Sequence, residues 1–229
     1  MPGWALLDHL GSTLTRDQVA VALRAFAVSA GAETSLAVLR DATHPAIDLS
    51  VRAHSEALLR FLRAWGCRHL RRDDTGRSSR ALATWWSKFG PRLPPETAPL
   101  TDLDDAQLAA LGRAYAALAR SPAAFRASSR GDVPVSFGDT AAAKALFAIR
   151  PLAVPPWDEP MRRAFGWGHV DAAEYATFLS AVRGSLTGLA ERLRVQPSEL
   201  PAALDRPASS PVKLVDEFLW IRITRDRSA

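Results

Sequence analysis

The sequence predicts a compact all-α protein, and three observations support that prediction. Nearly every apolar segment repeats with helical spacing; within residues 47–65, for example, Val51, Leu58, Leu62 and Trp65 fall on one face. Capping residues precede several of these segments, and Gly or Pro follows them. No series of alternating apolar and polar residues predicts a sheet.

The length of the chain allows one substantial hydrophobic core. Its 229 residues are 48% hydrophobic and 23% charged, which is typical of a soluble globular protein. We expect a single globular unit. A two-lobed form is the alternative, with lobes of about residues 1–120 and 121–229 and a cleft between them.

Helices are predicted in order from their periodicity and their start and stop signals. They cover residues 15–30, 33–40, 47–65, 78–90, 101–120, 140–149, 158–165, 171–194, 197–204 and 212–224. Ser78 or Ser79 is expected to cap the fourth helix, and Asp171 with Glu174 forms a capping box for the eighth. The last segment has a β-branched end, which is also compatible with an extended strand.

Three connecting segments complete this pattern. Residues 67–77 form a basic loop that contains Asp and Gly, and residues 91–99 form a proline-rich connector. Residues 121–133, rich in Gly, Pro, Ser and Arg, are predicted to be a polar loop.

Positive charge is concentrated in one part of the chain. The net charge is +5, yet residues 60–92 alone carry nine Lys and Arg residues against two Asp residues. Five arginines lie in or next to the basic loop: Arg68, Arg71, Arg72, Arg77 and Arg80. Such a cluster suits a polyanion such as nucleic acid; the alternative is an arginine-rich surface that only keeps the protein soluble.

Several function classes find no support in the sequence. The single cysteine, Cys67, excludes an internal disulfide framework and a multi-cysteine metal site, and the five histidines lack metal-ligand spacing. We expect no metal and no cofactor, because no phosphate-binding or dinucleotide-binding glycine motif is present. No apolar run is long enough for a membrane span and residues 1–4 do not begin a signal peptide, so we expect a cytoplasmic location without a membrane partner.

Residues 135–165 organise the prediction of function. Gly138 permits a tight turn with positive φ, and an alanine-rich helix follows from Thr140. Pro155 and Pro156 fix an extended approach to Asp158, where the next helix opens. A carboxylate in this position is either a helix cap or a catalytic group on a rigid mount.

This stretch resembles the helix-hairpin-helix (endonuclease III-like) DNA glycosylases over about residues 134–165. The hairpin of that family corresponds to residues 134–138, and its catalytic aspartate corresponds to Asp158, twenty residues after Gly138. Ser136 stands where the family has its first hairpin glycine, and Thr140 stands where bifunctional members have a lysine. The resemblance therefore implies a monofunctional enzyme that uses water, without an iron–sulfur cluster.

The resemblance also implies DNA, in preference to RNA, as the partner, and it implies roles for individual residues. Backbone N–H groups of the turn would bind a DNA phosphate together with the five arginines; this turn comprises Ser136, Phe137, Gly138, Asp139 and Thr140. Asp158 would act on the N-glycosidic bond of a modified or damaged base. Lys144, one turn beyond Thr140, would pair with Asp158 or act as an amine nucleophile, although a lysine in such a helix more often reaches solvent.

A base taken out of the DNA stack needs an aromatic wall. Trp157, Trp85 and Trp86 are the residues predicted to form it, with burial in the core as the alternative for each. The predicted function is a hydrolase of DNA repair. The alternatives are a non-catalytic DNA-binding or protein-interaction module that retains the fold, and an unrelated helical bundle.

Overall fold

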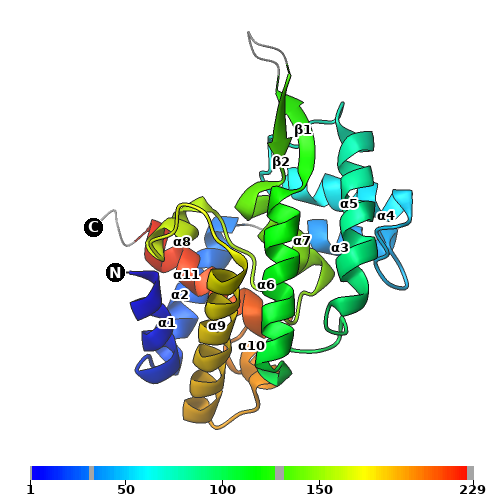
Figure 1. The fold of residues 1–229 in the computed structure, drawn as a ribbon. Helices are drawn as coiled ribbons and strands as arrows, with labels where there is room; N and C mark the ends of the chain where they lie inside the picture. Colours follow the sequence, from blue (N-terminus) through cyan, green and yellow to red (C-terminus); the bar gives the residue numbers. More distant parts are fainter. Residues whose placement is uncertain (1, 31–33, 127–131, 226–229) are drawn as a thin grey trace.

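Helices dominate the computed structural model, which describes residues 2–30, 34–126 and 132–225. The α-helices of the described chain are α1 (Gly3–Ser12), α2 (Arg16–Ala30), α3 (Ser35–Ala42), α4 (Arg52–Ala64), α5 (Thr75–Phe89), α6 (Asp105–Arg120), α7 (Gly138–Ile149), α8 (Glu159–Ala164), α9 (Ala172–Leu193), α10 (Leu200–Ala203) and α11 (Pro211–Thr224) (Figure 1). Short 3₁₀ helices cover Gly90–Arg92, Leu100–Asp102 and Pro197–Glu199. The mostly helical class predicted from the sequence is confirmed.

One small sheet departs from a purely helical fold. Strands β1 (Pro122–Arg126) and β2 (Val133–Ser136) pair antiparallel, with Phe125 opposite Pro134. The prediction of a loop over residues 121–133 was therefore wrong for β1 and for Val133, the first residue of β2; residues 127–131 lie outside the described residues. A lone two-stranded hairpin is marginally stable, and this one is fixed to α5 by the Ser78 hydroxyl, which donates to the Ala123 carbonyl oxygen at 2.5 Å.

The predicted start of α5, with Ser78 or Ser79 as its cap, was wrong. The helix begins at Thr75, so Ser78 and Ser79 lie inside it, where both are buried, and neither acts as its cap. The helix α1 was not predicted, and the expected first residue of α3, Glu33, lies outside the described residues. Residues 211–224 are helical throughout, so the extended alternative for that segment was wrong.

The capping box predicted at Asp171 and Glu174 is confirmed. Asp171 accepts hydrogen bonds from the N–H groups of Ala173 and Glu174, both at 2.8 Å, while Glu174 accepts from the N–H of Asp171. Asp104 and Gln107 form a second reciprocal box, which was not predicted, and α6 begins at Asp105 and not at residue 101 as expected. Each box satisfies N–H groups that the first helical turn leaves without a partner.

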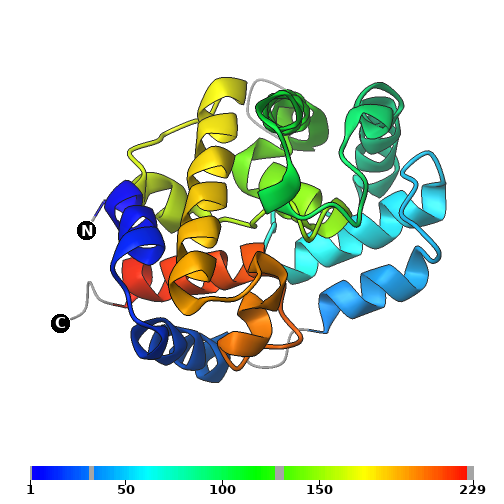
Figure 2. The ribbon, with the colours of Figure 1, turned by 90° about the horizontal axis from the view of Figure 1, so that it is seen from below.

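Among the described helices, the first, α1, packs against the last, α11. Helix α9 packs against α6 on one side and α1 on the other, while α11 packs against α2 (Figures 1 and 2). Glycines permit two of these close approaches: a Cβ on Gly112 would lie 2.1 Å from the carbonyl oxygen of Ala172, and one on Gly188 would lie 2.3 Å from that of Gly11.

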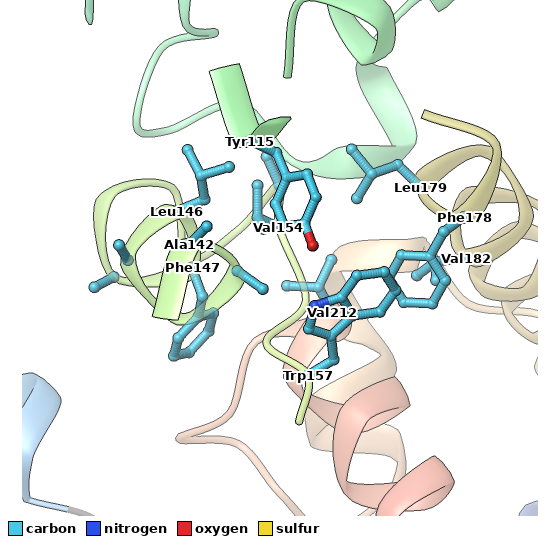
Figure 3. Close-up of a cluster of buried hydrophobic side chains, with 14 of the residues drawn as sticks. Tyr115, Ala142, Leu146, Phe147, Val154, Trp157, Phe178, Leu179, Val182 and Val212 are labelled. Atoms are coloured by element: carbon cyan, nitrogen blue, oxygen red, sulfur yellow. The ribbon is translucent and has the colours of Figure 1, made fainter. Parts of the chain in front are cut away.

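An aromatic core joins α6, α9 and the segment that approaches α8. The rings of Tyr115 and Tyr175 stack with their centroids 3.8 Å apart. Trp157 packs against Phe178 with ring centroids 4.6 Å apart (Figure 3). Trp157 is only 1% exposed, so burial fixes the backbone immediately before Asp158. Among the described residues, no helix combines the length and apolarity needed to cross a membrane.

Candidate functional site

Asp158 occupies the N-cap of α8 on an extended backbone with φ −125° and ψ −178°. Its Oδ1 accepts a hydrogen bond from the N–H of Met161 at 3.2 Å, and Pro160 lies in the first turn. The expected role as a helix cap is therefore present. An ionised carboxylate has about four acceptor positions on two oxygens, so a single bond to Oδ1 leaves capacity for a second role.

Asp158 also lines a pocket of about 520 Å³. Its lining comes from five separated segments of the chain, namely Phe26 of α2, Ala64 and Trp65 at the end of α4, Lys144 of α7, Pro156 to Asp158, and Lys213, Asp216 and Trp220 of α11. The volume lies within the range of small-molecule sites, which are typically about 300–1,000 Å³. The fold thus brings Asp158, Lys144 and Trp157 to the same pocket.

Two lysines flank the indole of Trp65 in this pocket. The Nζ of Lys144 donates a hydrogen bond to the backbone carbonyl oxygen of Trp65 at 2.6 Å and lies 5.9 Å from the centroid of its ring. The Nζ of Lys213 lies 5.3 Å from the same ring and 4.9 Å from the ring of Phe26. Aromatic faces at these distances attract a cation, so both ammonium groups are held at the pocket wall.

A buried carboxylate accompanies these lysines. Asp216 pairs with Lys213 one turn away on α11, and the side chains of the two residues are 9% and 15% exposed. Burial raises the pKa of Asp216, and the Asp158 carboxylate raises it further, while Lys213 and Lys144 oppose the increase. All four charged groups therefore interact electrostatically within one pocket.

Sequence reasoning missed Lys213 and Asp216. The signal that could have found them is the sequence VKLVDEFLWI, in which three charged residues interrupt an otherwise apolar helix. Charged residues are rarely buried unless they are paired. The third of them, Glu217, is buried beside Arg206, whose guanidinium donates to it at 2.8 Å.

The predicted tryptophan wall is only partly assembled. Trp157 borders the pocket, although its side chain is almost entirely buried. Trp85 lies in the core at α5, where its Nε1 donates to the carbonyl oxygen of Ala114 at 2.8 Å, and Trp86 lies on the same helix against Gly90. The structure places neither Trp85 nor Trp86 in the lining; Phe26, Trp65 and Trp220 provide the other aromatic rings there.

The basic loop lies against the turn that begins α7. A ring nitrogen of His69, Nε2, is 2.9 Å from the carbonyl oxygen of Phe137, and Gly138 has the expected positive φ of 71°. Arg63 of α4 holds the loop in place, because its guanidinium donates hydrogen bonds to the carbonyl oxygens of Leu70 and Arg71. All five predicted arginines of this region are exposed: Arg68, Arg71, Arg72, Arg77 and Arg80.

Two side chains of the α7 turn are turned inward. Phe137 is fully buried, and Asp139, 9% exposed, accepts a hydrogen bond from the Tyr115 hydroxyl at 3.0 Å and lies 3.2 Å from His169. At Phe137 and Asp139, therefore, only backbone groups are candidates for contact with a phosphate. The side chains of Ser136 and Thr140 are at least partly exposed. Thr140 and Lys144 lie one turn apart on α7, as expected.

The described residues contain no group of three or more His, Cys, Asp and Glu side chains arranged to hold a metal ion. No protein-family model, curated protein or solved structure matches the chain. The geometry of the pocket is therefore the basis for a functional assignment.

Proposed function

We propose that this chain is a DNA-binding base-excision protein, a monofunctional DNA glycosylase that hydrolyses the N-glycosidic bond of a modified or damaged base. The observation that carries the proposal is the joint presence of Asp158, Lys144 and Lys213 in one aromatic-lined pocket. The sequence predicts Asp158 as the catalytic carboxylate, and Lys144 as a residue that pairs with it or acts as an amine nucleophile.

The charges of the pocket complement the reaction. When the bond between C1′ and the base nitrogen breaks, its electron pair leaves with the base, so the sugar becomes positive and the base negative. A fixed carboxylate stabilises the developing positive charge, and fixed ammonium groups stabilise the negative one. Asp158 supplies the carboxylate, while Lys144 and Lys213 supply the ammonium groups.

Asp158 would also act on the water that completes the reaction. The water oxygen bonds to C1′, and the carboxylate takes the proton that the water loses. The N-cap bond to the Met161 N–H and the buried neighbour Trp157 hold the carboxylate in one place, which is the orientation that such a step requires. The rings of Phe26, Trp65 and Trp220 offer faces for a flipped base.

The surface beside the pocket supports nucleic acid as the substrate. Trp65 lines the pocket, and the first arginine of the basic loop, Arg68, follows it by three residues. The His69 contact with Phe137 brings that loop to the N-terminus of α7, where N–H groups of Gly138, Asp139 and Thr140 begin the helix. Both elements favour phosphate groups.

The test is the substitution Asp158→Asn, assayed on duplex and single-stranded oligonucleotides that each carry one modified base, with abasic sites revealed by alkali. Asn is as good an N-cap as Asp, so the substitution removes the carboxylate but retains the cap. We expect excision to fall by at least about 100-fold, with unchanged DNA affinity. Full activity in Asp158→Asn would refute the catalytic role.

A matched control is the same substitution at Asp171, the exposed N-cap of α9, which lies outside the pocket lining. Asp171→Asn should leave excision unchanged. Loss of activity in both variants would point to damage of the fold and would require the thermal stabilities to be compared.

A non-catalytic DNA-binding or protein-interaction module is the second candidate. It is favoured by the capping bond that Asp158 already makes and by Ser136 and Thr140 at the two positions where the resembling family has glycine and lysine. Wild-type protein that binds DNA with steep salt dependence, yet excises no base across the panel, would establish a DNA-binding module. Absence of DNA binding would indicate a protein partner.

A further inference from the structure

A second basic site lies apart from the Asp158 pocket, between helices α5 and α6. It is a groove of about 550 Å³, and its charged lining residues are Lys88, Arg92, Arg113 and Arg120. The remaining lining residues are Phe89, Ala110, Ala116, Ala117 and Ala172. None of these residues lines the Asp158 pocket.

The charge of this groove is uncompensated among the described residues. No acidic side chain of the described chain lines it, and none of its four cations forms an ion pair there. Four like charges around one hollow repel each other, and an anion in the groove relieves that repulsion. The alanine floor lets such a ligand approach the helix backbones closely.

The cations are spread over more than the width of one phosphate group. Arg113 and Arg120 are seven residues apart on α6, which places them on the same face at about 10 Å along the axis. Along the axis of B-form DNA, each strand carries one phosphate per roughly 3.4 Å, so a separation of about 10 Å corresponds to about three nucleotide steps along that axis. A chain of phosphates fits this spacing better than a single phosphate.

Helix α5 connects the groove with the basic loop. Arg77 lies eleven residues before Lys88, which is about three turns, so both residues lie on one side of the helix. The guanidinium of Arg77 lies 3.7 Å from the ring centroid of Phe125 in β1, which holds it at the hairpin end of α5. Helices α5 and α6 lie side by side (Figures 1 and 2). Lys88 of α5 and Arg113 and Arg120 of α6 therefore line one groove.

We propose that the groove between α5 and α6 binds the sugar-phosphate backbone of a nucleic acid, at a site separate from the pocket in which the base is excised. The identity of the ligand rests on the proposed function, because continuity with the arginines beside α7 favours nucleic acid over an acidic protein. The groove contacts phosphates and carries no base specificity.

The test compares two double variants of equal charge change by titration of labelled DNA with salt. Arg113→Gln/Arg120→Gln removes two groove cations, both exposed. Arg24→Gln/Arg40→Gln is the matched control, with exposed arginines on α2 and α3, outside both sites. The groove variant should reduce the slope of log affinity against log salt by about 1.8 for duplex and about 1.4 for single-stranded DNA. The control should keep the wild-type slope.

Each other outcome has a definite meaning. Equal slopes for the groove variant and the control, with intact binding by the wild type, would overturn the groove assignment but leave the excision pocket untouched. Displacement of DNA from the groove by polyglutamate of equal charge, as effectively as by unlabelled oligonucleotide, would assign the groove to an acidic protein and overturn the proposal. Wild-type protein that binds neither form of DNA would overturn this proposal and the proposed function together.

Discussion

The contact between α1 and α9 at Gly188 yields a sharp prediction. A Cβ built on Gly188 would lie 2.3 Å from the carbonyl oxygen of Gly11, whereas contacts of a Cβ below 3.0 Å essentially do not occur. Gly188→Ala therefore forces the two helices apart by roughly 0.7 Å or more. Arg192 resists that shift, because its guanidinium donates to the carbonyl oxygens of Leu10 and Leu14 at 2.6 and 3.1 Å.

The same helix provides the control. Gly184 lies one turn earlier on α9, it is exposed, and nothing lies within 4 Å of a Cβ added there. Gly184→Ala should stabilise the protein by about 0.5–1 kcal/mol through helix propensity. Gly188→Ala gains the same term but carries an overpacking cost of about 1–3 kcal/mol, so it should be the less stable of the two by that amount.

The assay is thermal unfolding of both variants, followed by circular dichroism. The steric cost alone corresponds to a difference in Tm of about 2–4 °C for each kcal/mol in a chain of this size. Equal stabilisation by both substitutions would refute the close crossing of α1 and α9, and with it the docking of the first helix on the last part of the chain.

Three further predictions concern buried polar groups. Burial raises the pKa of Glu217 to about 7, and the pKa of Asp216 is also raised, so the folded state retains protons that the unfolded state releases. The free energy of unfolding should therefore fall as pH rises from about 4.5 through 7, by up to about 3 kcal/mol for Glu217. Glu217→Gln should flatten this part of the pH profile, measured by unfolding titrations. Lys213→Met leaves the Asp216 carboxylate buried without its ion-pair partner. It should lower the free energy of unfolding by about 3–5 kcal/mol at neutral pH. Adding Asp216→Asn should recover part of that loss, and a double-mutant cycle measures this coupling. Ser78→Ala removes the buried hydrogen bond to β1, should cost about 1–3 kcal/mol, and should speed amide exchange in the hairpin; unchanged exchange would contradict that role.

The sequence predicted most of the helices because their signals are local. Periodicity located α4, α6 and α9, and the capping box at Asp171 fixed the start of α9 closely. The start of α6 was predicted four residues too early, at residue 101, because the box at Asp104 was not recognised. Ser78 misled the prediction since a serine suits a cap as well as a buried hydrogen bond. Its true partner is 45 residues away, a separation that no local pattern encodes.

The pocket was predictable only in part, for the same reason. The prolines and the residue before α8 identify Asp158 as a rigidly mounted carboxylate, and the α7 pattern identifies Lys144. Lys213 and Asp216 reach the pocket because α11 packs against α2 and α8, which is a tertiary fact. Trp85 and Trp86 are as aromatic as Trp65, but neither lines the pocket. Trp85 packs on α6 instead, where its Nε1 donates to the carbonyl oxygen of Ala114.

The assembly of the pocket from segments as distant as Phe26 and Trp220 has a thermodynamic consequence. Unfolding separates every part of its lining, so a ligand of the pocket binds only the folded chain. Such a ligand must raise the free energy of unfolding, by about 2.7 kcal/mol at one hundred times its Kd. A thermal-shift screen of free nucleobases and nucleosides can therefore detect an occupant of the pocket before any reaction has been found.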